Sequence, residues 1–446
     1  LTVSSAASDV YKRQLLKGEY RAKINASTMI NQSKTCHQAE IDSACELIDF
    51  WRFNVQYARE IYEDLQPPVS PSSMWNSSEV RPLEGFVFSV TPFNFSSIAA
   101  NLPSSAAIMG NTGVWKPSRN SYLSNYYLMR LMMDAGLPDG VINFIPGKAS
   151  MIGDICLSHP MLAGIHFTGS TSVFRQMWKD VANNLANLRS YPRIVGETGG
   201  KDFIVAHPNC DQKALTVALI RGAFEYQGQK CSAASRAYIP ESVWNAIKDD
   251  YVNEVSKISV GDPKDFSNFM GAVIDRKSFD NIAGYIDRAN RDSGCEIVTG
   301  GEYDDSTGYF VQPTTIVCSD PNYETMAEEI FGPVLSIYVY PDHEFIETLD
   351  LCDNTSEYAL TGSIFAANRE DIEVAMAALR YSAGNFYIND KPTGAVVGQQ
   401  PFGGARGSGT NDKAGSPLNL LRWVSPRSIK ETFAPPHDWT YGFLNE

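Results

Sequence analysis

Apolar runs of three to seven residues alternate with longer amphipathic stretches through the first half of the chain. The apolar runs lie at 85–91, 113–116, 141–145, 164–168 and 194–196. Their length and their β-branched and aromatic residues predict strands. Helices are predicted between them, at 96–109, 122–135, 149–158 and 173–188. Strands that alternate with helices form a parallel sheet covered on both faces, so an α/β fold is predicted.

A second α/β series follows residue 200. Its predicted helices lie near 213–226, 243–256, 276–289 and 371–380, and its strands near 203–205, 237–239, 334–340 and 383–388. We therefore expect two α/β units with a cleft between them. Ligands of such sheets bind beyond the carboxyl ends of the strands. Before the first unit, 16–65 is predicted to be helical, and the proline-rich 66–76 ends that helix.

The two ends of the chain do not continue these patterns. Residues 1–14 have no hydrophobic period that continues into the helical stretch from residue 16, and we interpret them as a non-native cloning or assembly scar. The tail after Gly415 contains four prolines and is not expected to form a domain of its own.

The composition argues against several classes of partner. The 446 residues include 37 Lys and Arg and 51 Asp and Glu, a net charge of −14 with no basic cluster, which disfavours nucleic acid and anionic membranes. No apolar run reaches the roughly 18 to 20 residues of a membrane-spanning helix. The eight cysteines lie far apart without a C-x-x-C pair, as is typical of a reduced, intracellular protein. The six histidines show no helical pairing, so no metal site is predicted.

One cysteine has surroundings that suit catalysis. Cys231 follows a predicted helix, with Lys230 before it and the small residues Ser232 and Ala233 after it. A neighbouring ammonium favours the thiolate, and small neighbours leave the sulfur room to meet a substrate. Because a single cysteine is more often a buried, inert thiol, its neighbours alone make Cys231 only a candidate nucleophile.

Two polar residues at predicted strand ends could assist such a nucleophile. Glu197, in the run GETGGK, has glycine neighbours, and a carboxylate that can swing there suits a general base. Asn94, between two phenylalanines, could donate an amide hydrogen to a developing oxyanion. A turn carboxylate and a turn-capping asparagine remain alternative interpretations of these residues.

No G-x-G-x-x-G motif follows a strand, but other segments suit a nucleotide. Gly169 and Ser170 open a predicted helix, whose N-terminal N–H groups can bind a pyrophosphate. Lys116 closes another strand, where a lysine suits ribose hydroxyls. Glu328 and Glu329 follow a helical stretch and could equally be a solvated helix face.

Together and in order, seven segments resemble the aldehyde dehydrogenase superfamily. They are PFNF (92–95), WKPS (115–118), FTGS (167–170), GETGGK (196–201), GQKCSA (228–233), EEIFGPV (328–334), and NFYIND with PFGG (385–390, 401–404). The resemblance runs from about residue 16 to the end of the chain. It implies a Rossmann-like NAD-binding domain, an α/β catalytic domain and a small β oligomerisation flap.

The resemblance also implies a role for each site residue. Cys231 attacks an aldehyde carbon, Asn94 and the Cys231 N–H hold the oxyanion, and Glu197 activates the water that releases the acid. The residues implied to bind NAD are Lys116, Ser118, Gly169, Ser170, Glu329 and Phe331. The residues implied to bind the substrate are Phe95, Lys230, Ser232, Gly394, Ala395 and Phe402.

Four longer sequence segments indicate which substrate class is expected. They are QSKT (32–35), AEID (39–42), FEYQGQKCSA (224–233) and VVGQQPFGGARGSGTNDKAG (396–415). They resemble the branch of the family that oxidises glutamate γ-semialdehyde to glutamate in proline catabolism. The loop at 393–395 agrees with that substrate, because its small residues expose N–H groups to an α-carboxylate. Arg119 and Asn120 stand where many relatives have an acidic residue, and they could contact the cofactor ribose.

The family architecture implies an NAD-binding domain at 15–200, a catalytic domain at 201–414, and a flap made of a hairpin near 68–84 and the tail 415–446. Relatives carry a stretch before the segment that begins near residue 16, so the NAD-binding domain is expected to be N-terminally truncated. Exposed flap strands need a partner, so at least a homodimer is expected. Eukaryotic relatives imply the mitochondrial matrix, with a bacterial cytoplasm as the alternative.

Three other functions stay open. They are oxidation of another small semialdehyde such as succinic semialdehyde, a cofactor-free thiol esterase, and a non-catalytic scaffold. A scaffold is expected to lack one of Cys231, Glu197 and Asn94, and all three are present. The cofactor segments argue against the esterase, and the sequence of the 394–415 loop argues against succinic semialdehyde.

Overall fold

The computed structural model describes residue 14 and residues 16–444, and its first sheet is the predicted one. Five parallel strands lie in the order β4-β3-β2-β5-β6. Their bounds are β2 Phe86–Val90, β3 Thr112–Lys116, β4 Ile142–Phe144, β5 Leu162–Thr168 and β6 Arg193–Glu197. All neighbouring pairs are parallel, so each connection is a crossover, here through a helix.

Helices cover both faces of this sheet, because the strands carry apolar side chains on both sides. The connecting helices are α5 Ser96–Ile108, α6 Tyr122–Asp134, α7 Ala149–Ser158 and α8 Thr171–Asn184. Phe88 and Ile165 pack with α7 and α8, whereas Trp115 packs with α5 and α6 on the opposite face. These three side chains are buried, and their removal from water holds the sheet between two helical layers.

The second sheet has seven strands in the order β16-β15-β7-β8-β13-β12-β9. They are β7 Asp202–Ala206, β8 Ala234–Pro240, β9 Cys295–Thr299, β12 Thr314–Cys318, β13 Val334–Tyr340, β15 Thr361–Phe365 and β16 Asn385–Ile388. Only the edge strand β9 is antiparallel to its neighbour. Helices α9 Gln212–Phe224 and α10 Glu241–Val255 cover one face, and α11 Arg276–Arg291, α13 Phe345–Asn354 and α14 Arg369–Ala378 cover the other. The predicted α/β class is confirmed, and the two sheets fall on either side of residue 200.

The prediction of one continuous helix over 16–65 is wrong. The segment divides into α2 Glu19–Gln32, α3 Cys36–Ala39, a π-helical turn at Glu40–Cys45 and α4 Glu46–Asp64. Ser33 ends α2 with a φ of 56°, in the left-handed region. Ile41, in the π-helical turn, is 43% exposed although Ala44, three residues later, is buried, because a π turn changes the residue spacing along the helix.

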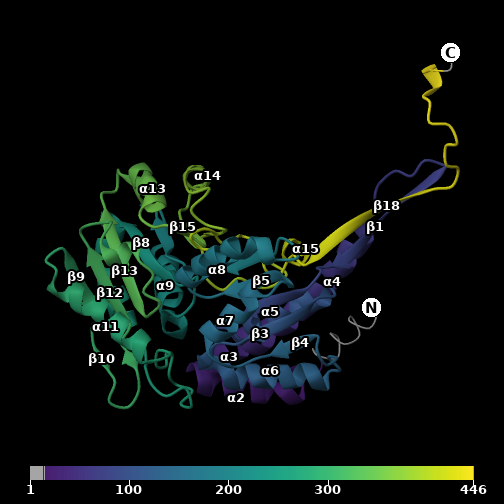
Figure 1. Cartoon of the computed structure of the whole chain (residues 1–446). Helices are drawn as coiled ribbons and strands as arrows, with labels where there is room; N and C mark the ends of the chain where they lie inside the picture. The colour runs from purple at the N-terminus through teal and green to yellow at the C-terminus, as the bar shows by residue number, and fades with distance from the viewer. Residues whose placement is uncertain (1–13, 15, 445–446) are drawn as a thin grey trace.

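The predicted hairpin at 68–84 takes a different form. β1 Met74–Pro82 lies in this segment and pairs antiparallel with β18 Val424–Thr432 of the tail. The two-stranded ribbon projects from the body of the molecule (Figure 1). Between α15 Pro417–Leu421 and β18, the buried Trp423 anchors the tail against the His166 ring, 4.7 Å away between centroids.

Several features concern the whole described part of the chain. Among residues 14 and 16–444, no helix has the length and apolar character needed to cross a bilayer. The same residues contain no group of three or more His, Cys, Asp or Glu placed to hold a metal ion. All eight cysteines are free thiols. Of the 1–14 segment interpreted as non-native, residues 1–13 lie outside the described part.

Candidate active site

The carboxyl ends of four strands of the first sheet bring predicted site residues to one edge. They are Asn94 and Phe95 after β2, Lys116 at the end of β3, Gly169 and Ser170 after β5, and Glu197 at the end of β6. Neighbouring parallel strands end at the same edge, so segments far apart in the sequence supply one site.

Cys231 lies in the loop between α9 and β8, and the backbone of this loop is unusual. Tyr226 and Gln227 have φ values of 52° and 55°, in the left-handed region that costs a non-glycine residue about 1 to 2 kcal/mol. Long-range hydrogen bonds hold them there. The Gln227 Nε2 donates to the carbonyl oxygens of Ser33 and Ala272, each at 2.9 Å. Tertiary contacts therefore set the path of the chain that leads to the nucleophile.

Asn94 is attached to the same loop. Its side chain is buried, and its Nδ2 donates to the carbonyl oxygen of Gln229 at 3.0 Å, two residues before Cys231. An amide nitrogen carries two hydrogens, so one remains for an oxyanion at the sulfur. The structure thus places Asn94 beside the nucleophile loop, as the sequence predicts.

Cys231 is partly exposed and lines a cavity of about 190 Å³ that Glu197 also lines. Burial, followed by nearby carboxylates, raises the pKa of the Cys231 thiol well above its usual value. The expectation that Lys230 favours the thiolate does not hold, because its Nζ pairs with a Glu225 oxygen at 3.2 Å. The sulfur is therefore a protonated thiol until a base removes its proton.

Glu197 faces the glycines of the PFGG segment. Its Oε2 accepts a hydrogen bond from the Gly404 N–H at 3.2 Å, and a Cβ at Gly403 would lie only 3.0 Å from its Oε1. The two glycines therefore let this carboxylate approach the backbone closely. Burial raises the pKa of Glu197 well above its usual value, against the lowering effects of Gly404 and Lys413. A carboxyl with a raised pKa can take up a proton near neutral pH, as a general base must.

The glycines of the GETGGK segment make room for a second carboxylate. The Gly200 N–H donates to Glu329 Oε1 at 2.9 Å, and a Cβ at Gly199 would lie 2.5 Å from Oε2. A Cβ at Gly200 would also lie 2.1 Å from the Cys231 carbonyl oxygen. Burial raises the pKa of Glu329 to about 7. These glycines allow Glu329 and the nucleophile loop to pack against one another.

The cavity at Cys231 brings together the predicted substrate residues. Its walls include Phe95, Lys230, Ser232, Gly394, Ala395 and Phe402. The hydroxyls of Ser232 and Thr393 are 2.8 Å apart, which joins the nucleophile loop to the 393–395 loop. Gly394 has a φ of 90°, a conformation that glycine adopts easily and other residues rarely adopt. Aromatic rings beside a few polar donors suit a short aliphatic chain that ends in an anion.

Sequence reasoning missed the acidic wall of this cavity, formed by Asp42 in the π-helical turn and Glu46 at the start of α4. Burial raises the pKa of Glu46 to about 8, and the Ser97 hydroxyl donates to its carboxylate. Asp42 pairs with Lys34, whose Nζ lies 4.2 Å from the centre of the Phe95 ring. In the sequence these carboxylates resemble a solvated helix face. The π turn, a frequent mark of functional sites, is visible only in three dimensions.

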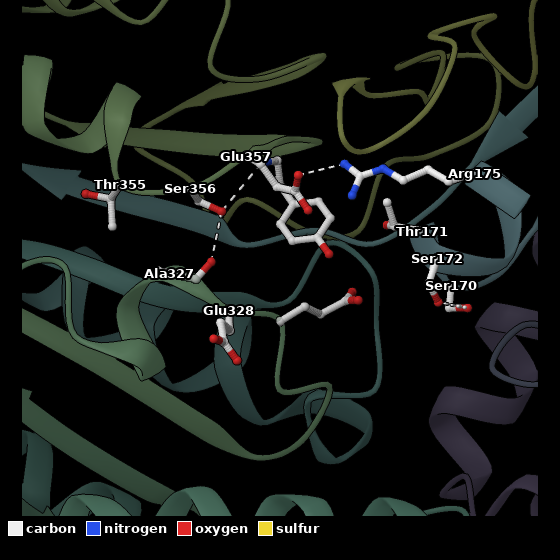
Figure 2. Close-up of a pocket in the computed structure, with 11 residues that line it drawn as sticks. Ser170, Thr171, Ser172, Arg175, Ala327, Glu328, Thr355, Ser356 and Glu357 are labelled. Carbon is white, nitrogen blue, oxygen red and sulfur yellow. Dashed lines mark hydrogen bonds and ion pairs between the residues drawn. The ribbon is translucent and has the colours of Figure 1, made fainter.

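A second cavity, of about 540 Å³, lies between the first turn of α8 and the segments 327–329 and 355–358 (Figure 2). Arg175 of α8 reaches Glu357, with its Nη2 2.6 Å from the carboxylate (Figure 2). The first N–H groups of a helix have no acceptor within it, so the Ser170 end of α8 suits a pyrophosphate. Glu329, on the facing segment, offers a carboxylate to ribose hydroxyls. These groups fit a dinucleotide such as NAD.

The other predicted cofactor residues lie on adjoining loops. Lys116 is 7% exposed, and burial lowers the pKa of its ammonium. Ser118 comes two residues later and precedes a short 3₁₀ turn. Phe331 has a φ of 57° and packs edge-to-face on Phe93, with ring centroids 5.9 Å apart. Phe331 thus connects the segment after Glu329 to the loop that carries Asn94.

A cysteine and a carboxyl of raised pKa in one cavity, with a dinucleotide cleft nearby, suit oxidation through a covalent intermediate. The model of the aldehyde dehydrogenase family matches residues 11–429, a range that begins inside the 1–14 segment. The chain belongs to the aldehyde dehydrogenase family. The resemblance seen in the sequence is confirmed, and the chain is an NAD-dependent oxidoreductase.

Individual relatives are similar over almost the whole chain. The mitochondrial delta-1-pyrroline-5-carboxylate dehydrogenase of Dictyostelium discoideum is 54% identical over 432 residues, which are 96% of this chain and 77% of that protein. The corresponding protein of Homo sapiens is 49% identical over 431 residues, 96% of this chain and 76% of the relative. The crystal structure of the Mycobacterium tuberculosis Delta-pyrroline-5-carboxylate dehydrogenase bound with NAD is 53% identical. The structural match covers 100% of this chain and 81% of the Mycobacterium tuberculosis chain, with a TM-score of 0.95.

Proposed function

We propose that this aldehyde dehydrogenase oxidises L-glutamate γ-semialdehyde, the open form of Δ1-pyrroline-5-carboxylate, to L-glutamate with NAD⁺. The proposal rests on one cavity. It is lined by Cys231 and Glu197 and also by the hydrogen-bond donors of Ser232 and residues 394–395. Those donors suit the α-carboxylate of the substrate. Glu46, on another wall, can accept a hydrogen bond from its α-ammonium group. The names of relatives that are 54% and 49% identical support the same substrate.

The first half of the reaction forms a thioester. Cys231 gives its proton to Glu197, and the sulfur bonds to the aldehyde carbon while the carbonyl electron pair moves to oxygen. The second N–H of Asn94 and the Cys231 N–H stabilise that oxyanion. Bound NAD⁺ would supply the acceptor for the hydride that this carbon loses as its carbonyl re-forms in the thioester. Phe95 and Phe402 hold the aliphatic chain and keep bulk water away.

The second half releases the acid. Glu197 first releases the Cys231 proton to solvent and then takes a proton from a water molecule, whose oxygen bonds to the thioester carbon. The carbon–sulfur bond then breaks, which leaves glutamate and frees Cys231. Because burial raises the pKa of Glu197, the carboxyl can hold each proton between steps. The residues that would hold the dinucleotide are Lys116, Ser118, Gly169, Ser170, Glu329 and Phe331.

Formation of NADH tests this function. The enzyme should turn over Δ1-pyrroline-5-carboxylate with a kcat/KM at least about tenfold above that for succinic semialdehyde or acetaldehyde, since each well-formed hydrogen bond to a charged group contributes about that factor. Equal turnover of the three compounds would contradict the substrate. A hydrolytic activity on thiol esters without NADH formation would favour the esterase instead.

For the domains, we propose that 15–200 binds NAD, 201–414 carries the nucleophile, and 68–84 with 415–446 forms the oligomerisation flap. The flap ribbon has open edges, and Trp75 and Phe433 on it are 56% and 61% exposed, which favours a homodimer. Light scattering should give twice the chain mass, and Trp75→Glu combined with Phe433→Glu should give monomers. A monomeric parent protein would contradict this assignment.

We place the enzyme in the mitochondrial matrix, because the relatives from Dictyostelium discoideum and Homo sapiens are named mitochondrial. Fractionation of the source cells tests this. The protein should resist added protease in intact mitochondria and become sensitive once both membranes are lysed. Recovery in a cytosolic fraction, as in a bacterium, would contradict it.

A further inference from the structure

The loop after β3 has an unusual charge for the wall of an NAD site. β2, α5 and β3 form the first strand–helix–strand unit of the sheet. In such units an acidic residue near the end of the second strand binds the 2′-hydroxyl of the adenosine ribose, whereas an arginine accommodates a 2′-phosphate. Here the second strand ends in Lys116-Pro117-Ser118-Arg119, and the sequence has no Asp or Glu between Glu84 and Asp134.

The two cationic side chains of this loop, Lys116 and Arg119, form no ion pair with a carboxylate of the described residues. Arg119 is exposed and forms no ion pair with the described residues, and burial alone lowers the pKa of Lys116. Asp275 approaches from the second α/β unit. Its Oδ2 accepts from the Asn120 Nδ2 and its Oδ1 from the Ser278 N–H, each at 2.9 Å. That carboxylate is therefore engaged in capping α11 and in holding Asn120.

The position of this loop suits the adenosine end of a dinucleotide. β3 and β5 are both parallel neighbours of β2, so their carboxyl ends lie about 10 Å apart at the same edge of the sheet. Ser170, at the end of β5, begins the helix assigned to the pyrophosphate. A ribose next to that pyrophosphate would lie within reach of the Lys116 and Arg119 side chains.

We propose that Lys116, Ser118 and Arg119 form a subsite for a 2′-phosphate, so that the enzyme accepts NADP⁺ as well as NAD⁺. The proposal rests on the dinucleotide position given under the proposed function. The Arg119 guanidinium can donate two parallel hydrogen bonds to phosphate oxygens, and the Lys116 ammonium adds a second positive charge. No carboxylate of this loop repels a phosphate, so the feature that usually rejects NADP⁺ is absent here.

Binding of an adenosine fragment tests the subsite without catalysis. In calorimetry at low salt, the full chain should bind 2′,5′-ADP about tenfold to a hundredfold more tightly than 5′-AMP, the range expected for hydrogen bonds to a charged group. Added salt should reduce this preference. Arg119→Gln should lose most of it and Arg119→Glu should reverse it. Arg130→Gln, a change of another half-exposed arginine on α6 near Asp134, should retain it.

Kinetics then connect binding to turnover. The ratio of kcat/KM with NADP⁺ to kcat/KM with NAD⁺ should fall about tenfold or more in Arg119→Gln and stay unchanged in Arg130→Gln. Equal affinity of the parent protein for the two fragments, or an unchanged preference in Arg119→Gln, overturns the subsite. Failure of the parent protein to oxidise glutamate γ-semialdehyde with NAD⁺ would overturn the proposed substrate and leave the fragment result standing.

Discussion

Replacement of Glu197 by glutamine separates the two halves of the proposed reaction. Glutamine has nearly the same shape, and its amide oxygen can still accept the Gly404 N–H that now bonds Glu197 Oε2 at 3.2 Å. The carboxamide cannot take a proton from water. The cavity and the Cys231 loop should therefore stay in place while deacylation loses its base.

A positioned general base contributes about 100-fold to 10,000-fold, so the barrier to deacylation should rise by about 3 to 5 kcal/mol. Rapid mixing of Glu197→Gln with NAD⁺ and Δ1-pyrroline-5-carboxylate should show a burst of one NADH per active subunit. A near stall should follow, since the thioester accumulates on Cys231. Mass spectrometry of the quenched enzyme should find the acyl group on that residue.

Two outcomes would refute this reasoning. A variant with parental steady-state turnover would exclude Glu197 as the deacylation base, and a variant with no burst would place its role before the thioester. The pH dependence adds a check. Because the pKa of Glu197 is raised, its carboxyl is protonated at low pH and becomes a base as the pH rises. The parental rate should therefore increase with pH across the neutral range, and Glu197→Gln should lose that increase.

Three further substitutions test other parts of the structure. Gly200→Ala would place a Cβ 2.1 Å from the Cys231 carbonyl oxygen, and the resulting displacement of the nucleophile should slow the NADH burst about 100-fold, with NAD binding by calorimetry as the control. Ser232→Ala should raise KM for Δ1-pyrroline-5-carboxylate about tenfold and leave KM for acetaldehyde unchanged, because only the former has an α-carboxylate; equal effects on both would contradict the anchor. Arg236→Met should lower the free energy of unfolding by about 2 to 5 kcal/mol, because the buried guanidinium donates to the carbonyl oxygens of Lys201 at 2.8 Å and Cys352 at 3.0 Å, and each buried acceptor left without a donor costs about 1 to 3 kcal/mol. Denaturant titration measures that loss, and the exposed Arg380→Met should change it by less than about 0.5 kcal/mol.

The regular elements were largely predictable, because their signal is local. Strands such as 86–90 and helices such as 149–158 have the apolar period of their own secondary structure. Strands β9, β12 and β15 of the second sheet escaped prediction, since short apolar runs carry little periodic information. The break at Ser33 was also missed, although the polar run around it has no apolar period that favours a helix. The pairing of β1 with β18 joins segments about 350 residues apart, and no local pattern contains it.

For the candidate site, too, local motifs were predictable and contacts between distant segments were not. Asn94, Glu197 and Cys231 stand in motifs long enough to be recognised, and the structure brings all three to one place. The environment of these residues was less predictable. Lys230 precedes Cys231 in the chain, yet its ammonium pairs with Glu225. Glu46 lines the same cavity although nothing in its sequence surroundings distinguishes it from a surface glutamate.

By itself, the sequence determined the α/β class, the candidate nucleophile with the residues expected to assist it, and the family, because periodicity and motifs are properties of neighbouring residues. The tertiary structure alone decided which groups are buried, which carboxylates face the Cys231 cavity, and how the tail is held. Those properties depend on burial and on contacts between distant segments. Cys231 is a protonated thiol and Glu197 a carboxyl of raised pKa because folding takes both away from much of the water that would solvate their charged forms.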